Sequence, residues 1–289
     1  MNLDFKNDEE DTFRNRLMEH SQSLKSTSLS EIAKDISEII NCYSSSHNEF
    51  FLEYFKVLSS SDDPEFIHML EMFPMIDFLV DQLNSTQIIQ EKEIIMEIID
   101  NLVNHSPIFR TPDLLSHLFS YIETPESIEM YSVAFIFNIF YAIYQLLSEE
   151  SIDVFYNTHF FLHSMSFFGR SPQIDSLFLQ YSYKCAKEFP LNEELINFML
   201  TTFHAFFNEE TSDMIMLTIY TIYKKDSNIL SNENVCHMIV DSLQIPEVNS
   251  QKYALKLLSQ LQNTQIKFFD CSDSIVDRIF SIFDNNIEN

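Results

Sequence analysis

The chain has 289 residues, of which 45% are hydrophobic and 14% aromatic, and its formal net charge is −27. It contains a single glycine, whereas hairpin turns and phosphate-binding loops depend on glycine, so the composition argues against a sheet-rich fold and against a glycine-rich nucleotide site. The 44 acidic residues outnumber the 17 basic ones, and the resulting negative field disfavours binding to DNA or RNA.

Residues 1–26 form an acidic segment for which two structures stay open. The segment is either a disordered tail or a capping helix that carries Phe13 and Leu17 inward. It lacks the basic start and the apolar run of a signal peptide. For residues 27–289 we expect a single domain of armadillo-like helical repeats, for the reasons that follow along the chain.

Capping residues mark the first helix starts of this domain. Ser28 and Glu31 have the spacing of a capping box, in which each side chain satisfies an exposed backbone N–H of the other residue. They precede a helical stripe of isoleucines at 32–40. Asp63 followed by Pro64 predicts another helix start, because neither residue loses a hydrogen bond at those positions.

An apolar pattern then recurs about every 40 residues, a period typical of arrays of helical repeats. Each instance ends a short predicted helix and occupies the first, second and fifth positions of a five-residue window. A polar break and a longer apolar helix follow most of them. The instances are Leu79/Val80/Leu83, Leu118/Phe119/Ile122, Phe161/Leu162/Met165, Phe203/His204/Phe207, Ile239/Val240/Leu243 and Ile279/Phe280/Phe283.

Residues 130–147 form the longest stretch without a charged side chain. A helix that spans a membrane and a helix surrounded by other helices would both be this apolar. The flanks are acidic, with Glu129 before the stretch and Glu149 after it, whereas membrane spans carry basic residues on their cytoplasmic side. The stretch also falls on the period of about 40 residues. We therefore predict a buried helix that begins at Pro125.

Two segments show the junction between a short and a long predicted helix most clearly, LLSHLFSYIETPESIEMYSVAFIFNIF (114–140) and VCHMIVDSLQIPEVNSQKYALKLLSQL (235–261). Both resemble the junction of an armadillo repeat. The resemblance covers about residues 60–289 and implies an all-α, right-handed α-solenoid of about six armadillo/HEAT-like repeats. The last helix of each repeat would line a concave face that suits long peptides or protein partners. The near absence of glycine leaves the armadillo and HEAT subtypes both open.

Asn101 and Asn138 lie late in two of the long predicted helices. They resemble the asparagines with which nuclear-import adaptors of the armadillo class hold an extended peptide backbone. Those adaptors carry a Trp four residues earlier, where this chain has Glu97 and Ala134, and this chain has no Trp. The resemblance therefore predicts Asn101 and Asn138 as partner-binding residues without a full import-receptor groove.

The remaining candidates have a structural interpretation that we favour. His159 and His163 have a spacing that two metal ligands could use, but no third ligand accompanies them, and we expect a surface or packing role. Cys236 and His237 are adjacent, so their side chains diverge. The cysteines form no CxxC pair and are typical of reduced core thiols: Cys42, Cys185, Cys236 and Cys271. Four pairs fit proline-directed phosphorylation but are interpreted as helix N-termini: Ser106-Pro107, Thr111-Pro112, Thr124-Pro125 and Ser171-Pro172.

The sequence thus predicts a non-catalytic intracellular scaffold or adaptor that binds a partner protein or an extended peptide. A divergent nuclear-transport adaptor for basic cargo is the alternative, and a membrane-associated protein that uses residues 130–147 is a weaker one. We expect no enzymatic activity, no cofactor or metal, and no nucleic-acid or membrane partner. The expected location is the cytoplasm, with the nucleus also open, and the oligomeric state is left open.

Overall fold

The computed structural model describes residues 4–42, 49–123, 131–148, 151–157 and 159–260. These residues form α-helices and three short 3-10 helices, with no strand among them, which confirms the prediction of an all-α fold. The chain divides into two compact units, Met1–Ser151 and Ile152–Asn289. Whether residues 27–289 form one repeat domain stays a prediction.

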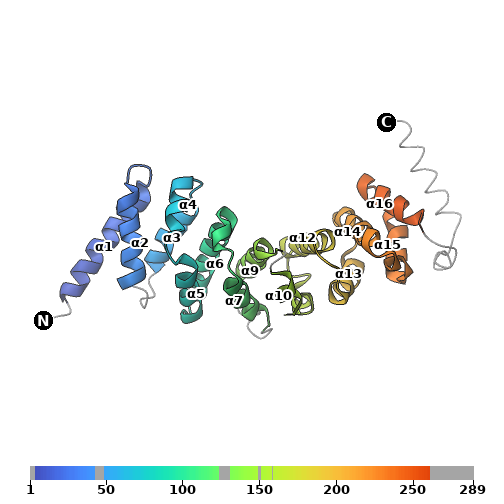
Figure 1. Ribbon diagram of the computed structural model, residues 1–289, viewed down its shortest axis with the longest axis horizontal. Helices are drawn as coiled ribbons and strands as arrows, with labels where there is room; N and C mark the ends of the chain where they lie inside the picture. The colour runs from blue at the N-terminus through green and yellow to red at the C-terminus, as the bar shows by residue number, and fades with distance from the viewer. Residues whose placement is uncertain (1–3, 43–48, 124–130, 149–150, 158, 261–289) are drawn as a thin grey trace. The chain divides into compact units, whose positions relative to one another are not determined.

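The first unit arranges its later helices in two rows (Figure 1). Helices α3, α6 and α9 pack one on the next and are called here the ledge row of the first unit. Helices α5 and α7 pack on each other and on α6 and α9 respectively, and form the flanking row. The helices of the unit are α1 (Asp4–Gln22), α2 (Leu29–Cys42), α3 (Glu49–Ser59), α4 (Pro64–Leu70), α5 (Met75–Ser85), α6 (Ile89–His105), η1 (Pro107–Phe109), α7 (Pro112–Glu123) and α9 (Val133–Leu146).

The second unit repeats this arrangement. Helices α12, α14 and α16 pack in succession along the upper side of the unit in Figure 1 and form its ledge row. Helices α11, α13 and α15 pack in succession as the flanking row. The helices of the unit are α10 (Ile152–Asn157), α11 (Phe160–Ser164), η2 (Met165–Phe167), α12 (Pro172–Glu188), α13 (Glu193–Phe206), α14 (Ser212–Lys225), η3 (Ser227–Ser231), α15 (Glu233–Gln244) and α16 (Val248–Leu258).

The predicted caps are confirmed in detail. The backbone N–H of Ser28 donates to the Glu31 carboxylate at 3.0 Å, and the N–H of Glu31 donates back to the Ser28 hydroxyl at 3.4 Å. The Ser28 hydroxyl also donates to the Glu31 carboxylate at 2.6 Å, and this bond, together with the one from the Ser28 N–H, lowers the pKa of Glu31. Asp63 caps α4 by accepting a hydrogen bond from the N–H of Glu65 at 3.0 Å, with Pro64 at the first helical position. Local side-chain chemistry therefore sets these helix starts, as capping preferences require.

Of the two alternatives left open for the N-terminal segment, its described residues form the helix. Helix α1 buries Phe13, which is 4% exposed, and Leu17, which is fully buried. Helix α1 packs on α3. Arg16 and His20 of α1 both bind the carboxylate of Asp35 on α2. The N-terminal helix is thus joined to the first unit by apolar contacts and by charge.

The apolar stretch 130–147 contains helix α9, whose start was predicted wrongly. In the described residues the helix begins at Val133 and not at Pro125, because Ser132 has an extended backbone and its hydroxyl accepts a hydrogen bond from the N–H of Phe135 at 3.1 Å. Residues 124–130 lie outside the described residues, as does the pair Thr124-Pro125. Among the described helices, none is both long and apolar enough to cross a membrane.

The face of α9 that points away from the core is less buried than predicted. Phe135 and Ile143 are fully buried, but Phe137, Asn138 and Tyr141 are half-buried. The rings of Phe137 and Tyr141 stack with centroids 5.9 Å apart. Helix α9 therefore presents an aromatic and polar stripe, where the apolar composition had predicted burial nearly all round.

Aromatic side chains dominate the core of the second unit. Phe155 lies 4.2 Å from Phe160 and 5.2 Å from Phe161, measured between ring centroids, and Phe161 lies 5.1 Å from Phe198 of α13. All four rings are at most 2% exposed. Edge-to-face and tilted pairs at these distances add to the apolar burial. This cluster joins α10 and α11 to α13.

Two cysteines are described with their side chains. Cys185 and Cys236 are free and fully buried, as predicted for core thiols. Burial raises the pKa of both thiols, so that neither is held as a reactive thiolate. The prediction for Cys271 lies outside the described residues, and so does that for the side chain of Cys42.

The recurring apolar pattern is completely buried in two of its five described instances. All three residues are buried in Leu79/Val80/Leu83 and in Leu118/Phe119/Ile122, and the last instance, Ile279/Phe280/Phe283, lies outside the described residues. In the fifth instance Val240 is half-buried, and in the fourth His204 is exposed and Phe207 is half-buried. The third instance also departs from the pattern. Phe161 is fully buried, but Leu162 is 61% exposed and Met165 is 37% exposed. These two exposed residues line a pocket of the second unit.

Candidate partner-binding sites

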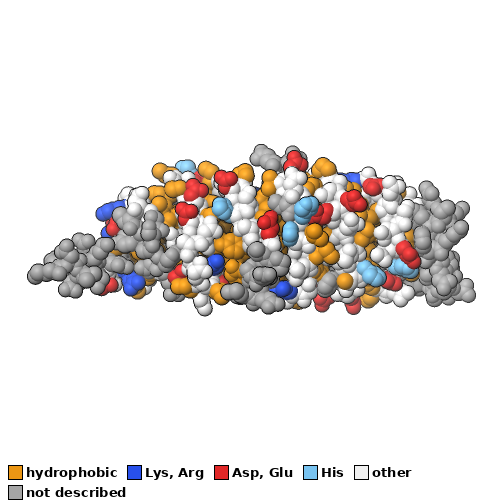
Figure 2. Space-filling view, turned by 90° about the horizontal axis from the view of Figure 1, so that it is seen from below, with side chains coloured by type: hydrophobic (Ala, Val, Ile, Leu, Met, Phe, Trp, Pro, Cys, Tyr) orange, Lys and Arg blue, Asp and Glu red, His pale blue; other side chains and the backbone are white. Residues whose placement is uncertain are grey.

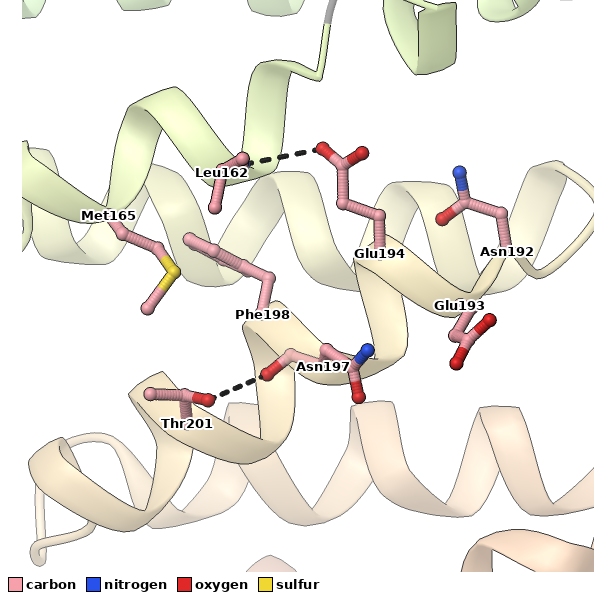
Figure 3. A pocket seen from close by; sticks show the side chains of 8 residues that line it. All are labelled: Leu162, Met165, Asn192, Glu193, Glu194, Asn197, Phe198 and Thr201. Carbon is pink, nitrogen blue, oxygen red and sulfur yellow. Dashed lines mark hydrogen bonds between the residues drawn. The ribbon is translucent and has the colours of Figure 1, made fainter.

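A pocket of about 450 Å³ lies between α11 and α13 of the second unit (Figure 3). Leu162, Met165 and Phe198 supply its apolar part, and in Figure 3 their side chains converge on the space between the two helices. The polar lining comes from one helix, α13, and the residue that caps it: Asn192, Glu193, Glu194, Asn197 and Thr201. An apolar floor with polar groups on one side is the usual composition of a binding pocket.

Leu162 points outward from the short helix α11. His159, which precedes the helix, has a left-handed backbone with φ of 52°, and α11 ends at Ser164, where the chain tightens into η2. Phe160 and Phe161 of α11 and Phe167 of η2 are buried in the core, whereas Leu162 is exposed and lines the pocket. The exposed side of α11 therefore supplies part of the pocket lining.

Glu194 fixes the edge of this pocket. One carboxylate oxygen lies 2.9 Å from Nδ1 of His159, and the other accepts a hydrogen bond from the N–H of Leu162 at 3.3 Å. Glu193 is exposed and takes part in no hydrogen bond or ion pair within the described chain. The pocket therefore has one carboxylate that is engaged with α11 and one that is open to a partner.

The flanking row of the first unit carries a smaller acidic pocket. About 190 Å³ of space lies between α5 and α7, next to the exposed carboxylates of Asp77 and Asp113. Ile76, Val80 and Leu114 form its apolar lining. On the face drawn in Figure 2, acidic side chains are spread among hydrophobic ones, and few Lys or Arg side chains are visible among the described residues. The chemistry of both pockets suits a side chain with an apolar stem and a basic end.

Asn101 lies on α6, where its side chain is engaged within the ledge row. Its amide nitrogen lies 3.3 Å from the hydroxyl oxygen of Ser59, the last residue of α3, and 3.3 Å from that of Ser60, which follows the helix. Four residues earlier, Glu97 forms an ion pair with Lys56 of α3 at 2.9 Å. Asn101 thus connects two helices of the row, and a partner backbone would compete with the two serines for its donor.

Asn138 lies on α9, the next helix of the same row. It is half-buried and forms no hydrogen bond within the described residues. Because α6 and α9 pack together, Asn101 and Asn138 occupy neighbouring helices of the ledge row. The structure therefore places the two predicted residues on one row, with different availability: the Asn138 amide is open and the Asn101 amide is shared with serines.

Asp100, next to Asn101, is a buried acid of the first unit. Its side chain is 9% exposed, and Oδ1 has no hydrogen-bond partner in the described chain. Burial, and to a smaller degree the charge of Glu97, raises the pKa of Asp100 well above the usual range. A carboxyl group of this kind favours the neutral form.

The other sequence candidates have structural roles. His159 pairs with Glu194 and does not share a helix face with His163, and within the described residues no cluster of His, Cys, Asp and Glu could hold a metal ion. Cys236 is buried, while His237 is exposed and lies 3.5 Å from Glu233. Ser106 and Ser171 cap η1 and α12, each accepting a backbone N–H, and Thr111 accepts one at the start of α7.

Comparisons with known proteins add no family to these observations: no protein-family model, no curated protein and no solved structure matches the chain. The two rows of each unit and the pockets of the flanking rows are therefore the features from which a function can be argued.

Proposed function

We propose that the protein is a non-catalytic interaction scaffold, built as a right-handed α-solenoid of about six armadillo/HEAT-like repeats, that binds an extended segment of a partner protein along its ledge rows. The observation that carries the proposal is the same succession of packed helices in both units, α3–α6–α9 and α12–α14–α16. Successive helices of such a row present similar positions in line, which suits a long and repetitive ligand better than a small substrate.

Half-buried polar and aromatic side chains along the rows support this proposal. Asn138 and Tyr141 on α9, and Tyr220 on α14, are neither core residues nor fully solvated ones. Such side chains lose little entropy on binding and offer both apolar area and hydrogen-bonding groups. In a solenoid, these helices would line the concave face, where an extended peptide is held by its backbone and by alternate side chains.

A selection of extended peptides from a displayed random library tests this function directly. We expect peptides that bind the full chain with micromolar or better affinity, typical of such modules, and whose binding weakens at least tenfold with Asn138→Arg on the ledge row. Met72→Arg places the same charge at a residue that is 75% exposed outside the rows and is the control. Absence of any enriched peptide, or binders that respond equally to both substitutions, would contradict the proposal.

A transport-type adaptor for basic cargo is the second candidate, and the acidic edge of the α11–α13 pocket favours it. A Lys or Arg side chain could lay its aliphatic stem on Leu162 and Phe198 and bring its charge to the open carboxylate of Glu193. This candidate predicts that Lys/Arg-rich peptides bind in a salt-sensitive manner and that Glu193→Gln weakens them several-fold. Affinity that is unchanged both by Glu193→Gln and by Asn101→Ala with Asn138→Ala would exclude it.

A further inference from the structure

Three lysines of the second unit lie over tyrosine rings. The Lys224 ammonium is 4.8 Å from the centroid of Tyr220, and the Lys256 ammonium is 5.1 Å from the same ring and 5.4 Å from Tyr253. On α12, the Lys187 ammonium is 5.7 Å from the centroid of Tyr183. We call these six residues the Tyr–Lys ladder: Tyr183, Lys187, Tyr220, Lys224, Tyr253 and Lys256.

The steps of the ladder occupy matching positions on neighbouring helices. Buried positions of α12 match buried positions of α14 that lie the same number of residues later in the chain. The matching pairs are Phe178 with Ile215, Ser182 with Ile219 and Cys185 with Ile222. At the same offset, Tyr183 corresponds to Tyr220 and Lys187 to Lys224. On α16 the step is continued in space, because the rings of Tyr220 and Tyr253 are 5.4 Å apart. The ladder therefore crosses the whole ledge row of the second unit.

The ladder gathers positive charge on one helix row of an acidic chain. The chain has 44 acidic residues for 17 basic ones, yet within the described residues none of the lysines Lys187, Lys224 and Lys256 forms an ion pair. All three are exposed. The hydroxyl groups of Tyr220 and Tyr253 form no hydrogen bond among the described residues. The ladder thus presents hydrogen-bond donors and positive charge, with no carboxylate bound to them.

We propose that the Tyr–Lys ladder of α12, α14 and α16 binds an acidic, extended peptide segment of a partner protein. The inference rests on the proposed scaffold function and names the chemistry of the partner. A carboxylate can accept hydrogen bonds from a lysine ammonium and from a tyrosine hydroxyl, and the ring beneath the lysine orients its charge. A long nucleic acid is disfavoured, because the negative field of the rest of the chain repels a ligand with one charge per nucleotide more strongly than a peptide with only a few carboxylates.

The spacing of the steps predicts the spacing of acidic residues in the peptide. Packed helices lie about 8–10 Å apart, and a peptide in the extended polyproline II conformation advances about 3.1 Å per residue with three residues per turn, so that every third side chain lies on the same face. Acidic side chains about three residues apart would therefore meet successive steps. A peptide with Glu at every third position fits the ladder, whereas a single acidic residue would engage only one step.

Fluorescence anisotropy with such a peptide tests the inference on the full chain. The probe is a labelled synthetic peptide with Glu at every third position, and the reference peptide has Gln in place of each Glu. We expect the Glu peptide to bind at least tenfold more tightly than the Gln peptide. Lys224→Gln with Lys256→Gln should weaken the Glu peptide at least tenfold, and Tyr220→Phe, which keeps the ring and removes one donor, should weaken it several-fold.

The matched control is Lys25→Gln with Lys34→Gln, which removes the same charge at two exposed lysines of the first unit. Equal loss with both double variants would overturn the inference, because net charge alone would then explain binding. Equal binding of a single-stranded oligonucleotide of the same charge, or no binding of the Glu peptide, would overturn it as well. If displayed peptides bind the chain but the Glu peptide does not, the scaffold function stands while the ladder inference fails.

Discussion

Asp35 of α2 accepts a hydrogen bond from Nε of Arg16 on α1 at 3.0 Å, although the aspartate side chain is only 1% exposed. The same carboxylate lies 2.5 Å from Nδ1 of His20 and accepts a hydrogen bond from the Tyr54 hydroxyl at 3.1 Å. A buried carboxylate costs free energy unless such partners surround it. Asp35 is therefore the polar centre at which α1, α2 and α3 meet.

Removal of this carboxylate should destabilise the first unit strongly. Asp35→Ala removes the acceptor that three polar side chains share, of which Arg16 keeps a second one in Glu38, and we expect a loss of about 3 kcal/mol in the free energy of unfolding. Tyr54→Phe removes one hydrogen bond and should cost about 1 kcal/mol. Urea denaturation followed by circular dichroism measures both changes. Glu38→Gln, which breaks the more exposed pair with Arg16, is the control and should cost less than about 1 kcal/mol. If Asp35→Ala costs no more free energy of unfolding than Glu38→Gln, the role of Asp35 is refuted.

Asp100 should make stability depend on pH. Its pKa in the folded chain is raised by burial and by the charge of Glu97. Between the unfolded pKa of about 3.9 and the raised folded pKa, the folded state therefore holds a proton that the unfolded state has released. The free energy of unfolding consequently falls as pH rises through this range. Asp100→Asn removes this penalty. We expect the variant to be more stable than the parent by at least about 1 kcal/mol at pH 8, since one pKa unit corresponds to about 1.4 kcal/mol.

Denaturation curves at a series of pH values between about 5 and 8 measure this effect. The stability difference between Asp100→Asn and the parent chain should widen as pH rises. Asp81→Asn removes the same charge from an exposed position of α5 and should show no such widening. A difference that narrows with rising pH, or that is the same for both variants, would contradict the burial of an uncompensated carboxyl group.

Phe161 and Leu162 are neighbours in sequence with opposite environments, which provides a matched pair for the core of the second unit. Phe161 is fully buried among Phe155, Phe160 and Phe198, whereas Leu162 is 61% exposed. Phe161→Ala should cost about 3–5 kcal/mol through lost burial and a cavity, and Leu162→Ala less than about 0.5 kcal/mol. Thermal or urea unfolding distinguishes the two. Similar costs would mean that α11 is oriented differently.

The proposed solenoid predicts a large radius of gyration in solution. A compact domain of 289 residues would have a radius of gyration of about 19 Å. A continuous stack of about six repeats is elongated, so small-angle X-ray scattering at several protein concentrations should give a clearly larger value that does not change with concentration. A value near that of a compact domain would exclude the solenoid.

Much of the fold could be predicted from local chemistry. Capping at Ser28, Asp63 and Ser171 depends on residues within one turn of the helix start, so the sequence pattern was sufficient. The start of α9 was misplaced, because Ser132 is also a good capping residue and lies beyond the Thr-Pro pair that had been favoured. A short-range signal identifies candidate starts, but it does not choose between two of them.

The candidate sites were harder to predict, because they depend on how helices turn and pack. Leu162 and Met165 fit the recurring apolar pattern, but Leu162 lies on the side of α11 away from the buried Phe160 and Phe161, and Met165 begins the 3-10 turn after the helix. The Tyr-x-x-x-Lys spacing of Tyr183 and Tyr220 is visible in the sequence. Its meaning was missed, because the contact of Lys256 with Tyr220 joins two helices that are far apart along the chain.

The measurement that tests the central claim most directly is photo-crosslinking of a selected peptide that carries a crosslinking residue at each position in turn, with the attachment sites mapped by mass spectrometry. A segment bound along the ledge row should attach to α12, α14 and α16 in that order, or in the reverse order, as the crosslinking position moves along the peptide. Attachment to one helix from every position, or to sites scattered over both rows, would contradict a scaffold that binds extended partners along its ledge rows.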